Sequence, residues 1–221
     1  MKNLLSLLQI SDSALPIGSV AHSYGLETLI AEAYVDVDSL EAYLESLLRN
    51  SGKQDGWGCR IGYQTAQLAD EQLFYAGWDE HHHTLSALRS SHELRAASEK
   101  IGRRLLQLIG QVEPHETIRW AWHSKQTHHA AVFGLIGHAL EIDVDTMVIV
   151  FLQQLVKAQI GAAQKLLPLG QNQATQMMWR LKPIIEEVAA QIDDDLPAAF
   201  PGLTELASMR HPYLQTRLFI S

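Results

Sequence analysis

The stretch DVDTMVIVFLQQLVKAQIGAAQKLLPLG, residues 143–170, decides the fold. Asp143 or Asp145 can begin a helix here, because a carboxylate accepts hydrogen bonds from the free N–H groups of a first helical turn. The helix continues through residues 147–167 and ends at Pro168 and Gly170, since proline cannot continue the backbone hydrogen bonds of a helix. The sequence therefore predicts one long helix, and helical patterns continue on both sides of it.

Two segments before this helix have the apolar spacing of a helix with one buried face. The first begins at Asp38, where Glu41 lies three residues on in the position of a capping box. The second runs from Ser91 to Ile109. The apolar faces consist of Leu40, Tyr43, Leu44, Leu47 and Leu48 in the first helix and of Leu94, Ala97, Ile101, Leu105 and Leu108 in the second, whose solvent side carries Arg95, Lys100, Arg103 and Arg104.

The remaining helical segments are joined by glycine and proline. We expect glycines at positions 52, 56, 58 and 62 to loosen the connection between the helix after Asp38 and the next one. A further helix is predicted over residues 173–192, with a kink at Pro183. There is no alternating strand pattern of useful length and no internal repeat. The predicted fold class is all-α.

The chain changes in composition at Asp193. Three aspartates are followed by scattered prolines and then by the apolar ending RHPYLQTRLFIS, residues 210–221. Such a segment packs poorly on itself, yet it is too apolar to remain a solvated tail. We therefore predict a single-domain helical bundle over residues 1–192 and a C-terminal arm over residues 193–221, which docks either on its own core or on a partner.

The N-terminus superficially resembles an export signal, because a leucine-rich run precedes Ser19-Val20-Ala21. Ser6 and Gln9 interrupt that run, however, and a signal peptide needs a continuous apolar stretch of about 7 to 15 residues. The leucines at positions 4, 7 and 8 have the spacing of a helix with one buried face. We expect an amphipathic helix, a loop over residues 11–18, and no cleavage after residue 21.

The composition excludes several classes of protein. The 221 residues carry a formal charge of −8, which argues against a general nucleic-acid binder. No continuous apolar stretch approaches the length of about 18 residues that predicts a membrane span. The single cysteine, Cys59, cannot form an internal disulfide, which suits a reducing cytoplasm. We therefore expect a cytoplasmic protein that binds neither nucleic acid nor membrane.

Eleven histidines raise the question of a metal site. His92-Glu93 and His115-Glu116 begin like the zinc-protease motif HExxH, but the second histidine is missing in both. His81-His82-His83 is expected on a solvated loop or helix start and could hold a metal only weakly. One enzymatic alternative remains, a metal-dependent hydrolase that uses Glu116, His123, His128 and His129 from two helices.

Other catalytic and cofactor motifs are missing. A phosphate-binding loop ending at Gly52-Lys53 would need a glycine at position 47, which is a leucine, and a serine or threonine after the lysine. There is also no glycine-rich dinucleotide motif and no GxSxG motif. We therefore predict no catalytic residue, no resident metal and no cofactor, and the pattern indicates a protein that works by interaction.

Five segments that occur in order along nearly the whole chain resemble the UreF family of urease accessory proteins. They are LLQISDSALPIGSVAHSYGLE at 7–27, RAASEKIGRRLLQL at 95–108, HHAAVFGLIGHALEI at 128–142, QKLLPLGQ at 164–171 and SMRHPYLQTRLFIS at 208–221. The resemblance implies an all-helical, homodimeric, cytoplasmic chaperone of protein maturation without catalytic activity. It further implies partners: the accessory protein UreD (also called UreH), the GTPase UreG and apo-urease, in a nickel-binding assembly for GTP-dependent nickel insertion.

The resemblance also assigns roles to particular residues. In the closing motif, the expected contacts to UreD are Arg210, His211, Tyr213, Arg217, Leu218 and Phe219, unless the arm folds only on its own core. Lys165 and Gln171 correspond to the surface that faces the GTPase, although a lysine at a helix end also opposes the helix dipole. The first motif contributes Pro16, Gly18, His22, Ser23, Tyr24, Gly25 and Glu27. Gly25 is expected inside a helix, packed closely against another backbone.

Overall fold

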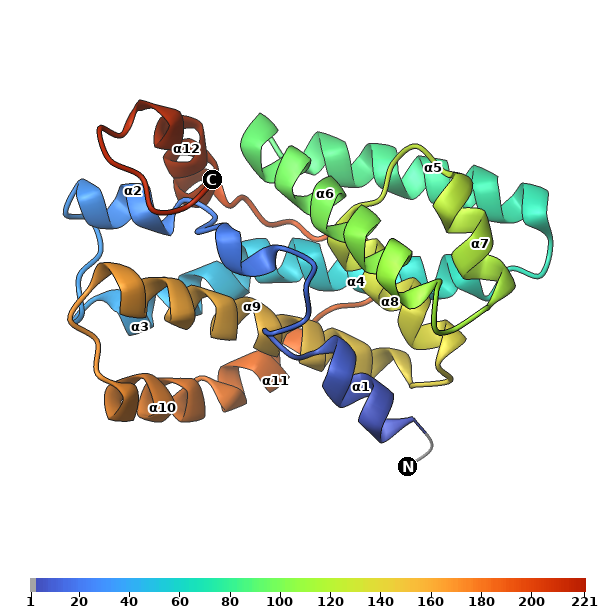
Figure 1. Cartoon of the computed structure of the whole chain (residues 1–221), viewed down its shortest axis with the longest axis horizontal. Coiled ribbons are helices and arrows are strands. Elements are labelled where there is room, and N and C mark those ends of the chain that lie inside the picture. The colour runs from blue at the N-terminus through green and yellow to red at the C-terminus, as the bar shows by residue number, and fades with distance from the viewer. Residues whose placement is uncertain (1–2) are drawn as a thin grey trace.

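The computed structural model describes residues 3–221, and this part of the chain contains helices and turns but no strand (Figure 1). The all-α prediction is confirmed. The α-helices are α1 (Leu4–Ile10), α2 (Leu26–Ala31), α3 (Leu40–Leu47), α4 (Lys53–Ala66), α5 (Glu71–Leu88), α6 (His92–Ile109), α7 (Glu116–His123), α8 (His129–Ala139), α9 (Val144–Leu166), α10 (Gln171–Arg180), α11 (Lys182–Ala190) and α12 (Gly202–Arg210), with a π-helical turn η2 (Leu48–Gly52) and 3-10 turns η1 (Ser19–Ala21) and η3 (His211–Tyr213).

Helix α9 is the long helix that its sequence predicts, and it lies at the centre of the bundle. The Asp143 side chain accepts a hydrogen bond of 2.9 Å from the Thr146 backbone N–H and so caps the first turn. The helix is long and apolar enough to cross a membrane by composition alone, with half of the relevant window buried inside the protein. It packs against α2, α4, α8, α10 and α11, so its apolar residues fill the core of the bundle.

Helix α3 and the following residue, Leu48 of η2, bury the apolar face that the spacing predicts from Leu40 onward. The predicted capping box at Asp38 and Glu41 is wrong. Asp36 and Ser39 instead form a small turn, in which the Asp36 carboxylate accepts hydrogen bonds from the Ser39 N–H and hydroxyl groups. The helix does begin in this region, at Leu40, but the carboxylate that accepts hydrogen bonds before it belongs to Asp36 and not to Asp38.

The glycines after α3 do not loosen a connection, and this prediction is also wrong. Gly56, Gly58 and Gly62 lie within α4, which continues from α3 through the π-helical turn. Gly62 of α4 and Gly134 of α8 allow these two helices to approach closely: a Cβ atom at Gly62 would overlap the Ala131 backbone, and one at Gly134 would overlap the Cys59 carbonyl. Glycine thus serves here to join two helices tightly.

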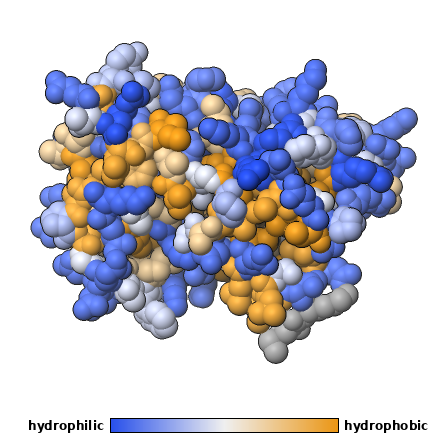
Figure 2. Space-filling view, in the orientation of Figure 1, coloured by the Kyte–Doolittle hydropathy of each residue, from blue (hydrophilic) through white to orange (hydrophobic). Residues whose placement is uncertain are grey.

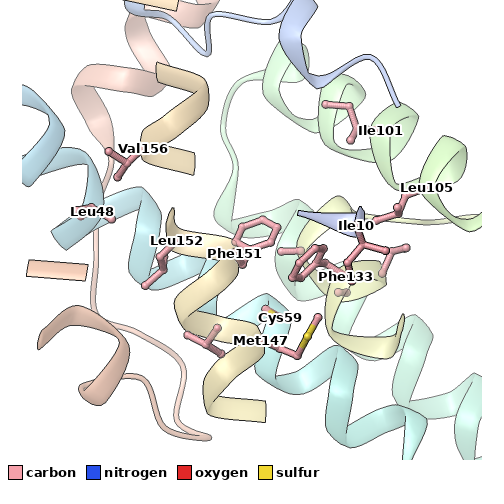
Figure 3. Close-up of a cluster of buried hydrophobic side chains, with 14 of the residues drawn as sticks. Ile10, Leu48, Cys59, Ile101, Leu105, Phe133, Met147, Phe151, Leu152 and Val156 are labelled. Carbon is pink, nitrogen blue, oxygen red and sulfur yellow. The ribbon is translucent and has the colours of Figure 1, made fainter. Parts of the chain in front are cut away.

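Apolar side chains fill the space around this helix contact. Figure 3 shows Phe133 of α8 and Phe151 of α9 near Cys59 and Met147, and their ring centroids lie 5.4 Å apart. The Cys59 thiol is completely buried, and burial raises its pKa. A buried thiol with a raised pKa is a poor nucleophile, so Cys59 is a packing residue.

The segment after α9 forms two helices instead of one kinked helix. Helix α10 ends at Arg180 and α11 begins at Lys182, with Leu181 between them. Pro183 lies in the first turn of α11, where its missing N–H group costs no helical hydrogen bond. The proline therefore begins a new helix at this point.

The C-terminal arm contains a helix that the sequence analysis does not predict. Residues Gly202–Arg210 form α12, and the chain then turns through η3 to run beside α2, where it ends (Figure 1). Phe219 and Ser221 are buried near this end. In the isolated chain, the arm therefore folds against the N-terminal part of its own bundle.

Candidate partner-binding site

The first family motif has an unusual backbone. The loop over residues 11–18 precedes η1, and Gly18, Tyr24 and Gly25 all have positive φ angles, of 87°, 53° and 87°. Gly25 therefore lies just before α2, and the expectation that it occupies a helix interior is wrong. The expected close approach is present, because a Cβ atom at Gly25 would lie 2.9 Å from the Thr204 carbonyl oxygen in α12.

Two residues after this glycine, the Glu27 carboxylate is buried and joins the two ends of the chain. One oxygen accepts hydrogen bonds from His211 Nε2 at 2.7 Å and from the Phe219 backbone N–H at 3.2 Å. The other accepts one from the Leu218 backbone N–H at 2.6 Å. Three donors from the closing motif therefore converge on one side chain of the first motif.

A second set of hydrogen bonds holds the last residue. The main-chain oxygen of Ser221 accepts hydrogen bonds from the Ser23 backbone N–H at 2.5 Å and from its hydroxyl at 3.1 Å. The Ser221 hydroxyl lies 2.7 Å from His22 Nδ1. Burial of the His22 ring lowers its pKa. Gln159 of the central helix donates to the Ser23 carbonyl at 3.0 Å and so fixes the motif to the core.

Helix α12 packs between these ends and the rest of the bundle. Its Glu205 side chain accepts a hydrogen bond from the Ser91 backbone N–H at the start of α6, and burial raises the pKa of this carboxyl. We call residues 22–27 together with residues 204–221 the terminal joint. The structure thus brings His22, Ser23, Glu27, His211, Leu218 and Phe219 into one unit, although the two motifs are nearly 200 residues apart in sequence.

The remaining tail residues face outward from the terminal joint. Tyr213 is 86% exposed, and Leu218 and Ile220 are each 62% exposed. Arg217 is also exposed, whereas Arg210 forms an ion pair of 2.8 Å with Glu32. The tail therefore divides into His211 and Phe219, which hold the arm in place, and an outer face of Tyr213, Arg217, Leu218 and Ile220. Figure 2 shows apolar surface on the half of the molecule that contains the C-terminus.

The expected GTPase-facing residues lie next to the terminal joint. Lys165 is near the end of α9 with its Nζ atom 5.1 Å from the centre of the Phe219 ring, a cation–π distance. Gln171 is the first residue of α10 and is exposed. The two groups of residues that the family resemblance assigns to different partners therefore meet at the Lys165–Phe219 contact.

Two residues of the first motif lie outside this contact. The Pro16 carbonyl accepts a hydrogen bond of 3.3 Å from Arg104 of α6, and Gly18 forms the turn before η1. Their role is to shape the loop that leads into the terminal joint. Val20 and Ile220 are 53% and 62% exposed, so both belong to the outer surface.

Sequence reasoning missed Gln159 and the whole of α12. Gln159 is a fully buried polar residue within an apolar helix. The sequence does contain one indication of this role: Gln159 lies between Ala158 and Ile160 on a core helix. A buried amide needs a hydrogen-bond partner, so a glutamine at this position predicts a polar contact.

The histidine cluster of the hydrolase alternative does not form. His123 is exposed, and its Nδ1 atom lies 2.8 Å from the Arg119 carbonyl oxygen of its own helix. His128 instead contacts the hydroxyl of Ser86 at 2.8 Å. His129 packs against Phe151, with ring centroids 5.2 Å apart. Within residues 3–221 there is no group of three or more His, Cys, Asp or Glu side chains placed to hold a metal ion.

The histidine triplet at 81–83 lies in the middle of α5, and its expected position on a loop or helix start is wrong. The three side chains point in different directions, as neighbours on a helix must. His82 is fully buried, His81 contacts the Thr65 hydroxyl at 2.9 Å, and His83 is exposed.

Comparisons with known proteins agree with the motifs. A family model described as UreF matches residues 34–182. The urease accessory protein UreF of Nostoc sp. (strain PCC 7120) is 33% identical, over 99% of this chain and 96% of the relative. The UreF proteins of Bacillus sp. (strain TB-90) and Geobacillus kaustophilus are 31% and 30% identical, each over 100% of this chain, and over 100% and 99% of their own lengths.

Proposed function

This chain belongs to the UreF family of urease accessory proteins, a family without catalytic activity, and we propose that it joins UreD to the GTPase UreG during urease maturation. In this role it acts in the cytoplasm as a homodimeric chaperone. It couples GTP hydrolysis by UreG to nickel insertion into apo-urease. The observation that supports the proposal is the contact of Lys165 with Phe219 of the terminal joint, because the residues that we assign to the two partners lie side by side there.

The UreD contact rests on the outer face of the tail. Tyr213 and Leu218 are apolar groups held outward on a backbone that Glu27 fixes from the other side. A fixed backbone lowers the entropy lost on binding, because the segment is already ordered before the partner arrives. Large exposed apolar side chains at the centre of a contact contribute most of its binding energy. These are the properties of a surface that docks on a partner.

The GTPase contact rests on the neighbouring end of α9. Lys165 is exposed and makes no ion pair within the described residues, so its charge is free to meet a carboxylate or phosphate of another protein. Its contact with Phe219 ties this surface to the tail. A movement of the tail on UreD binding would therefore alter the Phe219 contact of Lys165, which supports coupling between the two partners.

Copurification tests the assembly. Tagged UreD and UreG are each expected to retain the wild-type chain at micromolar concentration, and the Tyr213→Ala/Leu218→Ala variant should lose UreD while remaining folded. A matched control is Leu5→Ala/Leu8→Ala, which removes two exposed apolar side chains from α1 at the other end of the chain. A wild-type chain that binds neither partner contradicts the proposed function.

GTP turnover tests the coupling. In the complex with UreD and UreG, Lys165→Ala is expected to change the rate of GTP hydrolysis while the stability of the isolated chain stays within about 0.5 kcal/mol, since Lys165 is exposed. Asn172→Ala, at an exposed position in the first turn of α10, is the control for a general disturbance of this surface. Equal hydrolysis rates for wild type and Lys165→Ala would contradict the coupling and would mean that the protein is a structural scaffold without an effect on the GTPase.

A further inference from the structure

A groove of about 540 Å³ runs between α9 and α10, beside the terminal joint. Its apolar lining includes the small residues Ala158, Ala162 and Ala174. Three lysines line it, Lys157, Lys165 and Lys182, and none of its lining residues is an aspartate or glutamate. This lysine groove is a local cationic surface on a chain whose formal charge is −8.

The lysines of the groove have no carboxylate partner within residues 3–221, although Lys165 and Lys182 each lie over an aromatic ring. Lys182 lies 3.3 Å above the ring of Trp179, which is itself 69% exposed. Gln164, another lining residue, has a buried Nε2 group without a hydrogen-bond partner in this part of the chain. Lysines without a carboxylate partner and one amide N–H group without an acceptor therefore line the same groove.

Gly161 supplies an independent observation. It lies inside α9, where glycine costs about 1 kcal/mol relative to alanine. The glycines of the α4–α8 contact have an evident reason, since a Cβ atom there would overlap backbone. At Gly161, by contrast, a Cβ atom would meet nothing within 4 Å. The isolated chain therefore gives no packing reason for this glycine, and the open space above it belongs to the lysine groove.

We propose that the lysine groove receives an acidic segment of the GTPase, whose carboxylates meet Lys157, Lys165 and Lys182 while an apolar side chain enters above Gly161. This inference rests on the proposed function, because Lys165 and Gln171 of the GTPase-facing surface line the same groove. Trp179 offers an aromatic surface at the groove, and the Gln164 amide can donate to a carboxylate or backbone carbonyl. A symmetric contact with the same groove of a second copy is disfavoured, since it would bring the lysines of that copy toward these three.

The test measures the dissociation constant of purified UreG for the full chain, at about 50 and about 300 mM salt. Lys157→Glu/Lys182→Glu is expected to weaken binding about tenfold or more at low salt and to reduce the salt dependence. Lys125→Glu, an exposed lysine in the loop between α7 and α8, is the charge control and should leave binding unchanged.

A steric pair of variants tests the space above Gly161. Gly161→Phe fills it and is expected to weaken UreG binding about tenfold, whereas Gly161→Ala adds only one methyl group and should bind within about twofold of wild type. Both variants improve helix propensity, so both should remain folded. The Gly161→Ala variant thus shows whether weaker binding of Gly161→Phe comes from filling the groove or from replacing the glycine itself.

The outcomes distinguish this inference from the proposed function. If wild type binds UreG and both the charge and the steric variants bind equally well, the groove is not the docking site and the inference is overturned. If wild type does not bind UreG at all, the proposed function fails first. If Gly161→Phe converts a dimer to a monomer without changing UreG affinity, the occupant is a second copy, which also overturns the inference.

Discussion

The contact between α4 and α8 and the terminal joint both bring distant parts of the chain together, but by opposite means. In the first, Gly62 and Gly134 remove side chains so that two backbones touch, and apolar groups fill the surroundings. In the second, Glu27 draws His211 and two backbone N–H groups to one buried carboxylate. The helix contact excludes any added atom, whereas the tail of the terminal joint is held by hydrogen bonds to one carboxylate.

The difference has a functional consequence. Close-packed helices respond to change as a unit, since an interior at crystal-like density has no room for partial movement. A segment held by a few hydrogen bonds, with an exposed apolar outer face, opens at lower free energy than the core. We infer that the bundle is the rigid support and that the terminal joint is the part that responds to a partner.

Acid is expected to have the largest effect on the rigid region. Burial lowers the pKa of His82 and His129 to about 4 and that of His128 to about 3. Glu99, 3.9 Å from His128, is partly exposed and does not offset this burial. These histidines stay neutral in the folded state below pH 6.5, while the unfolded chain takes up protons. The free energy of unfolding should therefore fall with decreasing pH between about 6.5 and 4.

Each of these three histidines contributes a slope of up to about 1.4 kcal/mol per pH unit in that window. Denaturant unfolding at several pH values measures the sum. The variant His129→Leu removes one titrating group next to Phe151 and should have a shallower slope. A stability that stays constant from pH 6.5 to pH 4 would show that the histidines are not held neutral by the core.

A single methyl group should be the next most damaging change. Gly134→Ala places a Cβ atom on the Cys59 carbonyl, so α4 and α8 must separate, and we expect a loss of about 3 kcal/mol or more in the free energy of unfolding. Gly161→Ala is the matched control, because nothing lies near its Cβ atom and the helix gains propensity. Thermal or denaturant unfolding of both variants checks this, and equal stabilities would refute the account of the helix contact.

A smaller effect is expected at the terminal joint. Glu27→Ala leaves the Leu218 and Phe219 N–H groups and His211 without their acceptor, at a cost of about 1 to 3 kcal/mol. Limited proteolysis should then cut the tail before the bundle. Glu32→Ala, which removes a more exposed partner of Arg210, is the control and should change stability by less than about 1 kcal/mol. A tail equally resistant in wild type and Glu27→Ala would mean that Glu27 does not hold it.

Periodicity and capping chemistry predicted much of the bundle. The buried faces of α3 and α6 and the cap at Asp143 follow from local rules, because a helix with one wet side repeats its apolar residues every three or four positions. The glycines of α4 were misread because a glycine weakens an isolated helix. Only the opposing backbone of α8, far along the chain, explains them.

The sequence predicted which residues belong to the site but not how they contact one another. The family motifs pointed to Glu27, His211 and Phe219, yet nothing local indicates that a carboxylate at position 27 accepts hydrogen bonds from residues 211–219. Helix α12 was missed because its polar and apolar residues do not separate into two faces, so the tail lacks the pattern of an amphipathic helix. Long-range pairing of this kind depends on tertiary contacts that the spacing of residues does not encode.

Hydrogen exchange tests the difference between the two regions most directly. The backbone N–H groups of Leu218 and Phe219 report on the terminal joint, and those of α4 from Cys59 to Ala66 report on the helix contact. We predict that the tail groups exchange through local opening at lower free energy than the α4 groups, and that UreD binding slows their exchange while α4 is unchanged. Equal protection of both regions in the free chain, or tail exchange that UreD does not alter, would contradict the account.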